Sequence, residues 1–230
     1  MQLVGGCAGL AGVGLETLTM VRHGESVGNA AYFAAVDAGA EEVGSGTRDP
    51  DTPLSLLGRA QAVEVGERLA ELPESADVVL CSPYLRARET AEIALGAMGT
   101  ARARYDERLR DRDTGILYGL TGLGVRRRHP EVYRERERLG RFYYRPPGGE
   151  SWTDVGLRLR TLLPELDGHV LVFAHDVVIV MTRYILGGLD EQTILEIESS
   201  QLPNASISRW ERGESGMELV GYGETAHLTL

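Results

Sequence analysis

The chain lacks lysine entirely, so all 24 of its basic residues are arginine, and among its 230 residues it has only 2 cysteines. The missing lysine is most simply explained by genome base composition and indicates no function. Two cysteines are too few for a disulfide framework, so we expect a reducing compartment, the cytoplasm. No apolar stretch approaches the roughly 20 residues that cross a bilayer, and we therefore expect no membrane association.

Positive charge is also scarce, because 34 acidic residues against 24 arginines give a net charge of -10 and a pI near 5.1. We therefore expect no binding to nucleic acid, which needs a basic surface. The arginines are unevenly spread: residues 100–145 contain 13 arginines and 7 acidic residues, a net charge of about +6, while the remainder carries about -16. A local basic wall in an acidic protein suits a small anionic substrate.

Short apolar runs alternate with longer amphipathic segments, which is typical of helices that cover a largely parallel sheet. The sequence predicts an α/β fold: a single domain with a mostly parallel central sheet and helices on both of its faces. The expected strands are residues 17–21, 77–80 and 170–174, with later, edge-like strands near 205–209 and 218–222. Residues 1–16 are predicted to be a frayed tail and 17–230 the domain, with an inserted segment on the substrate side at about 100–150.

Three helices are predicted from the residues that begin them. Ser55 is expected to cap one helix, Ser82 followed by Pro83 begins a second over residues 84–97, and Ser151 opens a capping box for a third. The expected core stripes are Leu56, Ala60, Val63 and Ala70 in the first helix and Trp152, Val155, Leu159, Leu162, Leu163 and Leu166 in the third.

A short polar run, Arg22, His23, Gly24, Glu25 and Ser26, directly follows the first predicted strand. Open α/β sheets bind their ligands at the carboxyl ends of their strands. An imidazole nitrogen can attack phosphorus and carry the phosphoryl group, and a planar guanidinium can grip phosphate oxygens. The run therefore indicates phosphoryl transfer through a phosphohistidine, although a turn with a solvated histidine explains the same five residues about as well.

Two other strand ends carry residues of the same chemistry. Arg86 lies in the first turn of the helix after the second strand, where it can join Arg22 over one anion. His175 follows the third strand. A lone histidine in such a place is usually structural. Here, however, one strand end carries an Arg-His pair, a second an arginine and a third a histidine, and this combination favours a functional site.

Taken in order, these motifs resemble those of the histidine phosphatase superfamily, the phosphoglycerate mutase-like group. The matching segments are residues 22–29, 57–62, 82–91, 170–175 and 203–207, so the similarity runs from about residue 17 to 228. The resemblance implies the three-layer fold of that group and a small phosphorylated metabolite as substrate. It leaves the oligomeric state open.

The resemblance also implies a role for each matching residue. His23 would be the nucleophile and become a phosphohistidine that water later cleaves. The residues that would hold the phosphate are Arg22, Arg86 and His175, with Ser26 and Asn29 as further substrate contacts. No metal or other cofactor is implied. Because His23 has to attack unprotonated while His175 serves best as a cation, we expect their pKa values to be pulled apart.

The leaving oxygen needs a proton, which this family supplies from a glutamic acid; the residue that matches it here is Asp111. Aspartate is shorter and more acidic, and neighbouring arginines would lower its pKa further unless it is desolvated. Asp113 and Glu107 are the alternative acids. Asp176 also departs from the family pattern, which commonly has glycine after the second histidine, and its carboxylate could either orient His175 or repel the substrate phosphate.

The choice between phosphatase and mutase depends on two segments. Residues 126–128 lack the serine and the proline-rich stretch that follow an arginine pair in the mutases, and residues 142–151 resemble the phosphatase members, including the fructose-2,6-bisphosphatase domains. We therefore expect a cofactor-independent phosphatase. The alternatives are a mutase-type phosphotransferase and a catalytically weak phosphate-binding regulatory domain. Tyr143 and Arg145 are candidates for the pocket rim, or else solvated loop residues, and the arginines at 126–128 are expected to be exposed.

Overall fold

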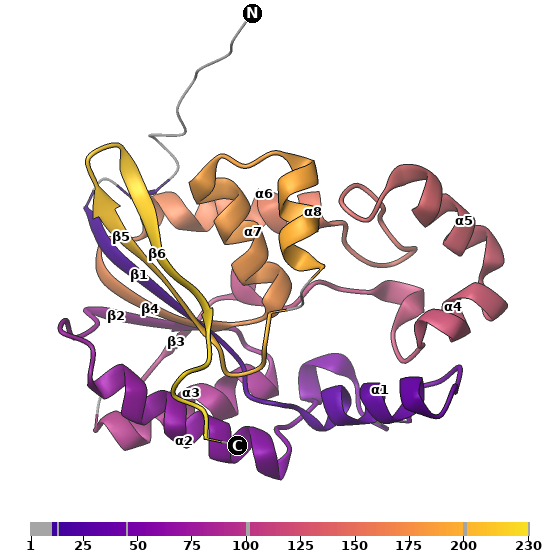
Figure 1. Cartoon of the computed structure of the whole chain (residues 1–230), viewed down its shortest axis with the longest axis horizontal. Coiled ribbons are helices and arrows are strands. Elements are labelled where there is room, and N and C mark those ends of the chain that lie inside the picture. The colour runs from indigo at the N-terminus through magenta and orange to yellow at the C-terminus, as the bar shows by residue number, and fades with distance from the viewer. Residues whose placement is uncertain (1–10, 13, 45, 100–101, 200–201, 230) are drawn as a thin grey trace, which may run out of the picture.

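The sheet has six strands and forms the centre of the molecule (Figure 1). The computed structural model describes residues 11–12, 14–44, 46–99, 102–199 and 202–229. Its strands are β1 (Leu15–Arg22), β2 (Val78–Cys81), β3 (Arg104–Tyr105), β4 (Gly168–Ala174), β5 (Ile207–Gly213) and β6 (Gly216–Glu224), in the spatial order β3-β2-β4-β1-β5-β6. The strands β1 to β4 are parallel, while β5 and β6 are antiparallel to their neighbours. The predicted mostly parallel sheet is confirmed.

Helices cover both faces of this sheet, as predicted. They are α1 (Val27–Asp37), α2 (Leu56–Ala70), α3 (Leu85–Met98), α4 (Gly122–Arg128), α5 (Pro130–Leu139), α6 (Trp152–Leu162), α7 (Asp176–Gly187) and α8 (Glu191–Glu198). Figure 1 shows α2 and α3 on one face and α6 and α7 on the other, with α4 and α5 extending to the side where α1 lies. Of the helices in the described part of the chain, none is both long and apolar enough to cross a membrane.

The central strand β4 shows why both faces need cover. Val170 and Val172 pack into one hydrophobic cluster with α6 and α7, whereas Leu171 and Phe173 pack into the other cluster with α2 and α3. Successive side chains of a strand point to opposite faces, and a parallel strand with helices on both sides is apolar throughout. The continuous apolar run that predicted this strand is therefore explained by burial on both faces.

The apolar stripe predicted for α6 is confirmed, whereas the one predicted for α2 is not. All six apolar residues predicted for α6 are buried, which confirms that stripe. The stripe predicted for α2 is wrong, because Leu56 is 89% exposed and Val63 is 42% exposed. A methyl group on Gly66 would lie 2.5 Å from the carbonyl oxygen of Ala94 in α3, so this close helix contact admits only small residues. The buried residues of α2 are Gly58, Gln61, Ala62, Val65, Gly66 and Leu69.

The structure also corrects the start of the domain. Strand β1 begins at Leu15, which is fully buried, and the amide of Gly12 already donates to the carbonyl oxygen of Leu163. Residues 12 and 15 of the predicted tail therefore pack against the domain, while residues 1–10 and 13 lie outside the described residues. Within the predicted inserted segment the chain forms α4 and α5, and the arginines at 126–128 are exposed, as expected.

Candidate active site

Three parallel strands, β1, β2 and β4, end at the same edge of the sheet, and a helix begins close to each of these ends. His23 directly follows β1, Arg86 is the second residue of α3, and His175 is the residue that caps α7. The imidazole rings of His23 and His175 are 5.2 Å apart between centroids. Because helix N-termini present free amide groups and the positive end of the helix dipole, this edge suits an anion.

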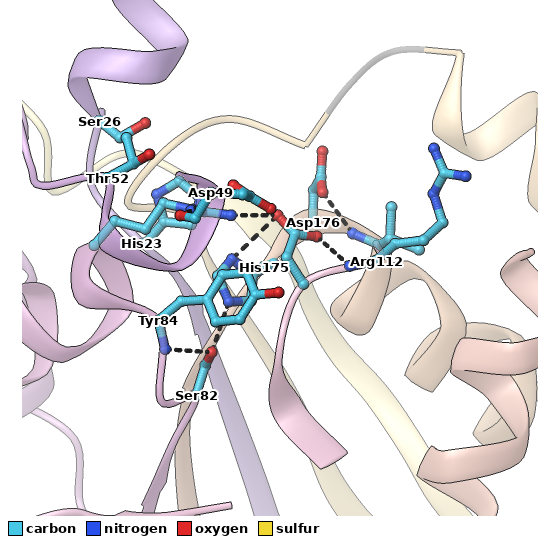
Figure 2. A network of polar contacts seen from close by, with 12 residues as sticks. His23, Ser26, Asp49, Thr52, Ser82, Tyr84, Arg112, His175 and Asp176 are labelled. Atoms are coloured by element: carbon cyan, nitrogen blue, oxygen red, sulfur yellow. Dashed lines mark hydrogen bonds and ion pairs between the residues drawn. The ribbon is translucent and has the colours of Figure 1, made fainter. Parts of the chain in front are cut away.

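A cavity of about 370 Å³ opens at this edge. Six of the predicted site residues line it: Arg22, His23, Ser26, Asn29, Arg86 and Asp111. His175 is completely buried directly behind His23, with its ring edge-on to it. Figure 2 shows the side chains of His23, Asp49, His175 and Asp176 converging from three separate segments of the chain. The structure thus brings together the residues on which the sequence-based hypothesis depends.

The orientation of His23 leaves one of its ring nitrogens free. Its Nδ1 lies 2.7 Å from the carbonyl oxygen of Gly24. A carbonyl oxygen only accepts hydrogen bonds, so Nδ1 carries the ring proton and the lone pair of the neutral ring lies on Nε2. Burial, followed by the positive charge of Arg86, the interaction with His175 and the positive charge of Arg22, holds the pKa of His23 well below its usual value. The imidazole is therefore neutral and nucleophilic at physiological pH.

His175 is held by polar groups on both sides of its ring. Its Nε2 lies 2.8 Å from Ser82 Oγ (Figure 2), and its Nδ1 lies 3.4 Å from Asp111 Oδ2. Ser82 had been expected to cap α3, but that helix begins at Leu85 with Tyr84 as its cap, and Ser82 Oγ instead accepts the amide proton of Tyr84. The serine therefore orients the second histidine, because its side chain is turned to the site and not to the helix.

The expectation that the two histidines have pKa values pulled in opposite directions is wrong. Burial lowers the pKa of His175 as well, and the opposing effect of Asp111 does not outweigh the burial and the charges of Arg86, Arg158 and Arg22. Removal from water disfavours the charged form of an imidazole. Both rings are therefore neutral in this structure, so the positive charge of the site comes from its arginines.

Both predicted arginines are buried and pair with carboxylates. Arg86 Nη2 lies 2.7 Å from Asp111 Oδ2, and its Nη1 lies 2.9 Å from Asp49 Oδ1 and 2.8 Å from the Asp49 carbonyl oxygen. Arg22 Nη1 donates to the carbonyl oxygen of Leu202, and its Nη2 lies 3.8 Å from Asp176 Oδ2. Each guanidinium is therefore fixed in direction by at least two oxygens.

Asn29 presents a donor to the cavity because its oxygen is already used. Ser26 caps α1, and Asn29 Oδ1 accepts from the backbone amide of Ser26 at 3.1 Å and from its hydroxyl at 2.9 Å. Asn204 Nδ2 donates to the same oxygen at 3.3 Å and to the carbonyl oxygen of His23 at 3.1 Å. The side-chain nitrogen of Asn29, Nδ2, is thus the donor that this residue offers to a ligand.

Several motif residues are structural and explain the spacing of the motifs. A methyl group on Gly24 would lie 2.4 Å from the carbonyl oxygen of Gly58, and one on Gly58 would lie 1.9 Å from that of Glu25. The amide of Glu25 donates to Gln61 Oε1, and Ser55 Oγ donates to Glu25 Oε1. The start of α2 therefore packs directly on the loop that carries His23 and holds it in place.

Four other predicted candidates do not line the cavity. Arg145 pairs with Asp154 at the start of α6, and Tyr143 is 55% exposed beside Phe142. Both side chains are largely exposed, which agrees with the alternative of solvated loop residues, and a role of Tyr143 and Arg145 at the rim stays a prediction. The alternative acids Asp113 and Glu107 are also absent from the residues that line the cavity.

The structure adds site residues that the sequence did not reveal. Asp49, in the 3₁₀ turn Asp49–Asp51, lines the cavity and pairs with Arg86. Arg112 and Arg141 line it as well. The outer wall is formed by Tyr32, Val43, Leu117, Tyr118 and Leu120. No sequence motif predicts these residues. Only Arg112 could have been inferred, because it directly follows Asp111 in the chain.

The titratable side chains do not form a metal site in the described part of the chain. Among those residues there is no group of three or more histidine, cysteine, aspartate or glutamate side chains placed to hold an ion. The carboxylates of the cavity, Asp49, Asp111 and Asp176, are instead paired with arginines.

Comparison with known proteins agrees with this geometry. The sequence model of the histidine phosphatase superfamily (branch 1) matches residues 18–225. A 2,3-bisphosphoglycerate-dependent phosphoglycerate mutase of Rhizobium meliloti (strain 1021) is 33% identical over 192 residues, which cover 79% of this chain and 84% of that protein. A phosphoglycerate mutase-like protein of Arabidopsis thaliana is 34% identical over 87% of this chain and 75% of its own length.

Solved structures show the same architecture. That of mycobacterial glucosyl-3-phosphoglycerate phosphatase superimposes with a TM-score of 0.71 at 27% sequence identity and covers 91% of this chain and 99% of its own. The alpha-ribazole phosphatase of Shigella flexneri, at 20% identity and a TM-score of 0.71, has the same fold. The chain therefore belongs to the histidine phosphatase superfamily, branch 1, and is an enzyme of the phosphatase type.

Proposed function

We propose that the protein is a cofactor-independent phosphatase that hydrolyses a small phosphomonoester through a phosphohistidine on His23. The observation that carries the proposal is the free Nε2 of a neutral His23 in one cavity with Arg22 and Arg86. A nucleophile that is unprotonated at physiological pH and two fixed cations beside it are what attack on a phosphate dianion requires.

In the first step the Nε2 lone pair of His23 attacks phosphorus, and the bond to the ester oxygen breaks in line with it. Arg22, Arg86 and the amide nitrogen of Asn29 bind the equatorial oxygens, where negative charge collects in the transition state. His175 is expected to donate a hydrogen bond to the phosphate from Nδ1, which is buried and has no hydrogen-bond partner among the described residues. Such an atom in a native protein needs a partner, which the phosphate supplies after a small displacement of Asp111.

In the second step water attacks the phosphohistidine and releases inorganic phosphate. The site retains His23 in place for this step, because its backbone carbonyl accepts from Asn204 Nδ2 and from the amide of Ala205 at 3.0 Å. The two hydrogen bonds hold the loop in addition to its packing on α2, so the imidazole does not have to be repositioned between the two half-reactions.

The charge of the cavity favours hydrolysis over a mutase reaction. Its lining contains four arginines, Arg22, Arg86, Arg112 and Arg141, and three carboxylates, Asp49, Asp111 and Asp176, a net charge of about +1 with neutral histidines. A bisphosphorylated intermediate carries two phosphates of about -1.5 to -2 each. Such an intermediate would leave a large uncompensated negative charge, whereas a single phosphomonoester would not.

The substrate is proposed to be a small phosphorylated metabolite, in agreement with the names of the phosphatases of the same fold. A cavity of about 370 Å³ holds a phosphate and a modest organic group beside it. We place the reaction in the cytoplasm, and the buried free thiol of Cys81 supports a reducing compartment.

The test is hydrolysis of p-nitrophenyl phosphate in the presence of EDTA, together with detection of a labelled phosphoenzyme after an alkaline quench, whose label is stable in alkali and lost in acid. Wild-type protein is expected to turn over and to carry the label, and His23→Ala is expected to lose both. His129→Ala, at the junction of α4 and α5 outside the cavity, is the matched control and is expected to keep both. Full turnover by His23→Ala would refute the phosphohistidine mechanism.

A mutase remains the second candidate, because sequence relatives such as that of Rhizobium meliloti carry that name. Phosphate transfer between the 2- and 3-positions of phosphoglycerate, faster than release of inorganic phosphate, would establish it. A binding domain without turnover, the third possibility, predicts that phosphate binds and that no phosphomonoester is hydrolysed.

A further inference from the structure

Three carboxylates surround the phosphate end of the cavity, and each reaction step needs one of them to exchange a proton. They are Asp49, Asp111 and Asp176. The leaving oxygen of an alkyl ester departs as an alkoxide unless an acid protonates it, so the position of the proton on these three groups decides the reactivity. Their surroundings differ enough to separate their roles.

Asp111 is held in its ionised form from both of its oxygens. Its Oδ2 accepts from Arg86 Nη2 at 2.7 Å and lies 3.4 Å from His175 Nδ1, while its Oδ1 accepts from the backbone amide of Arg112 at 2.8 Å. Burial alone would raise the pKa of Asp111, but the interactions with His175 and Arg86 lower it well below its usual value. A carboxylate with this many donors is a poor source of protons.

Asp49 is bound at one oxygen only. Its Oδ1 lies 2.9 Å from Arg86 Nη1, whereas its Oδ2 accepts no hydrogen bond from any described residue, and the side chain is 28% exposed to the cavity. The charged groups that face it are Arg86, Asp111 and Asp113. Burial raises the pKa of Asp49, the attraction of Arg86 opposes this, and the negative charges of Asp111 and Asp113 raise it further.

Asp176 lies between these two extremes. Its Oδ1 accepts the backbone amide of Val177 at 2.7 Å in the first turn of α7, and its Oδ2 lies 3.8 Å from Arg22. The amino end of a helix stabilises a carboxylate in its ionised form. Unlike Asp49, Asp176 therefore has a backbone donor at one oxygen and an arginine near the other.

Binding of the substrate strengthens this difference. The lining of the cavity carries about +1, so a phosphate dianion brings it to about -1, and uptake of one proton restores neutrality. Added negative charge raises the pKa of every carboxyl group nearby, and the proton goes to the group that binds it most tightly. Among the three carboxylates that group is Asp49.

We propose that Asp49 donates the proton to the leaving oxygen, while Asp111 stays ionised and acts as a positioning residue for Arg86 and His175. As the His23 Nε2–phosphorus bond forms, the electron pair of the breaking phosphorus–oxygen bond passes to the ester oxygen, which takes the carboxyl proton of Asp49. The resulting Asp49 carboxylate accepts a proton from the water that then cleaves the phosphorus–nitrogen bond. The cycle ends with alcohol, phosphate and the original enzyme.

The inference rests on the proposed phosphatase activity and is tested by the dependence on the leaving group. p-Nitrophenolate leaves without a proton, whereas the alkoxide of glycerol 2-phosphate does not. Asp49→Asn is expected to lower kcat/KM for glycerol 2-phosphate by about 100-fold or more and that for p-nitrophenyl phosphate by less than about tenfold. It should also abolish the loss of alkyl-ester activity at high pH, where wild-type Asp49 has given up its proton.

Two variants serve as matched comparisons. Asp51→Asn changes the same residue type in the same 3₁₀ turn, but Asp51 is 54% exposed, pairs with Arg48 and does not line the cavity, so both activities should be kept. Asp111→Asn should lower both activities by a similar factor, because it disturbs the arginine and the histidine that every substrate uses. Asp49→Glu keeps the carboxyl group and should restore the high-pH decline, which provides a second measurement if Asp49→Asn does not fold.

Equal losses on both substrates in Asp49→Asn would overturn the inference and leave Asp49 only as a partner of Arg86. A selective loss on the alkyl ester in Asp111→Asn or Asp176→Asn would assign the proton to that residue instead. Failure of the proposed function looks different, because the wild-type enzyme would then hydrolyse neither substrate and form no phosphohistidine.

Discussion

The inner end of the cavity and its outer wall are made from different kinds of chain. The inner end is formed where strands stop and helices begin, and His23, Arg86 and His175 there are between 0 and 4% exposed. The outer wall is carried by helix α1 and surface loops, and Tyr32 and Tyr118 in it are 39% and 40% exposed. Chemistry thus depends on the rigid part of the fold, while substrate choice is left to segments that tolerate change.

The outer wall is nevertheless joined by specific contacts. The backbone amide of Val43 donates to the carbonyl oxygen of Gly119 at 2.8 Å. The backbone amide of Thr121 donates to the carbonyl oxygen of Glu41 at 3.0 Å. The hydroxyl of Tyr118 donates to the carbonyl oxygen of Thr47 at 2.8 Å. These bonds connect two loops that are far apart in the sequence, so the wall should respond to mutation as a unit, separately from the inner end.

Removal of Arg86 is expected to have the largest effect. Arg86→Met leaves Asp49 and Asp111 without their shared cation, so kcat/KM should fall about 10³-fold for every phosphomonoester. The free energy of unfolding should fall by about 1–3 kcal/mol, because two half-buried carboxylates lose their partner. Phosphate-release kinetics and urea unfolding measure the two effects. Arg88→Met, on the same helix but outside the cavity, is the control; similar losses of activity in both variants would contradict a specific role for Arg86.

Loss of the Ser82 hydroxyl should come next. Ser82→Ala removes the hydrogen bond to His175 Nε2 and should lower kcat by about 10- to 100-fold, with a loss of about 1–3 kcal/mol in the free energy of unfolding. Ser208→Ala also removes a buried hydroxyl, which accepts from the amide of Gly223, but it lies outside the cavity. It should reduce stability and leave kcat unchanged. If the two variants reduce kcat equally, the difference between the inner end and the rest of the sheet disappears.

The pH dependence follows from the lowered pKa values of the two buried histidines. Neutral His23 persists below its ordinary pKa near 6.5, so kcat/KM for p-nitrophenyl phosphate should stay level as the pH falls from 7 through about 6.5. The unfolded chain takes up protons in this range and the folded chain does not. The free energy of unfolding should therefore fall between about pH 6.5 and 4.5, by about 1.4 kcal/mol per pH unit for each histidine.

His227 has a pKa lowered by partial burial and contributes to the same decline in stability. The measurement is urea unfolding at half-unit steps of pH, with activity followed in parallel. An acid limb of kcat/KM centred near pH 6.5, or a free energy of unfolding that does not change over this window, would show that the inner end is more hydrated than its burial indicates.

The smallest effect is expected at the outer wall. Tyr118→Phe removes one bond between the two loops, so KM for the physiological substrate should rise about two- to fivefold while kcat remains unchanged. p-Nitrophenyl phosphate should be hardly affected. Tyr133→Phe, on the exposed helix α5, is the control for loss of a tyrosine hydroxyl. A fall in kcat for both substrates in Tyr118→Phe would mean that the outer wall also orients the reacting groups.

The same division explains what the sequence could predict. The inner end was predictable because each strand end carries a chemically distinctive residue, and because apolar periodicity located the strands and the stripe of α6. The stripe of α2 was not predictable, since Gly66 is buried through the close approach of α3 and Gly58 through that of the loop at Glu25, and neither through hydrophobicity. Small residues at a helix contact leave no signal in an apolar pattern.

The gaps in the prediction of the site have a common physical cause. Tyr143 and Arg145 resembled a family segment, but the sequence does not show that Arg145 pairs with Asp154 and that Tyr143 is 55% exposed. Asp49 lies in a short turn with other polar residues, and only the folded chain reveals that it meets Arg86 from 37 residues away. Loop direction and contacts between distant segments depend on tertiary packing, which no local pattern contains.

The order in which the strands are joined has a consequence for synthesis on the ribosome. Strand β1, made first, lies between β4 and β5, which emerge near the end, and the backbone amide of Arg22 donates to the carbonyl oxygen of Ser206. The Arg22 guanidinium likewise depends on the carbonyl oxygen of Leu202. A nascent chain that stops before these residues cannot hold the loop that carries the nucleophile. Activity is therefore expected only once the chain has been made at least as far as Ser206.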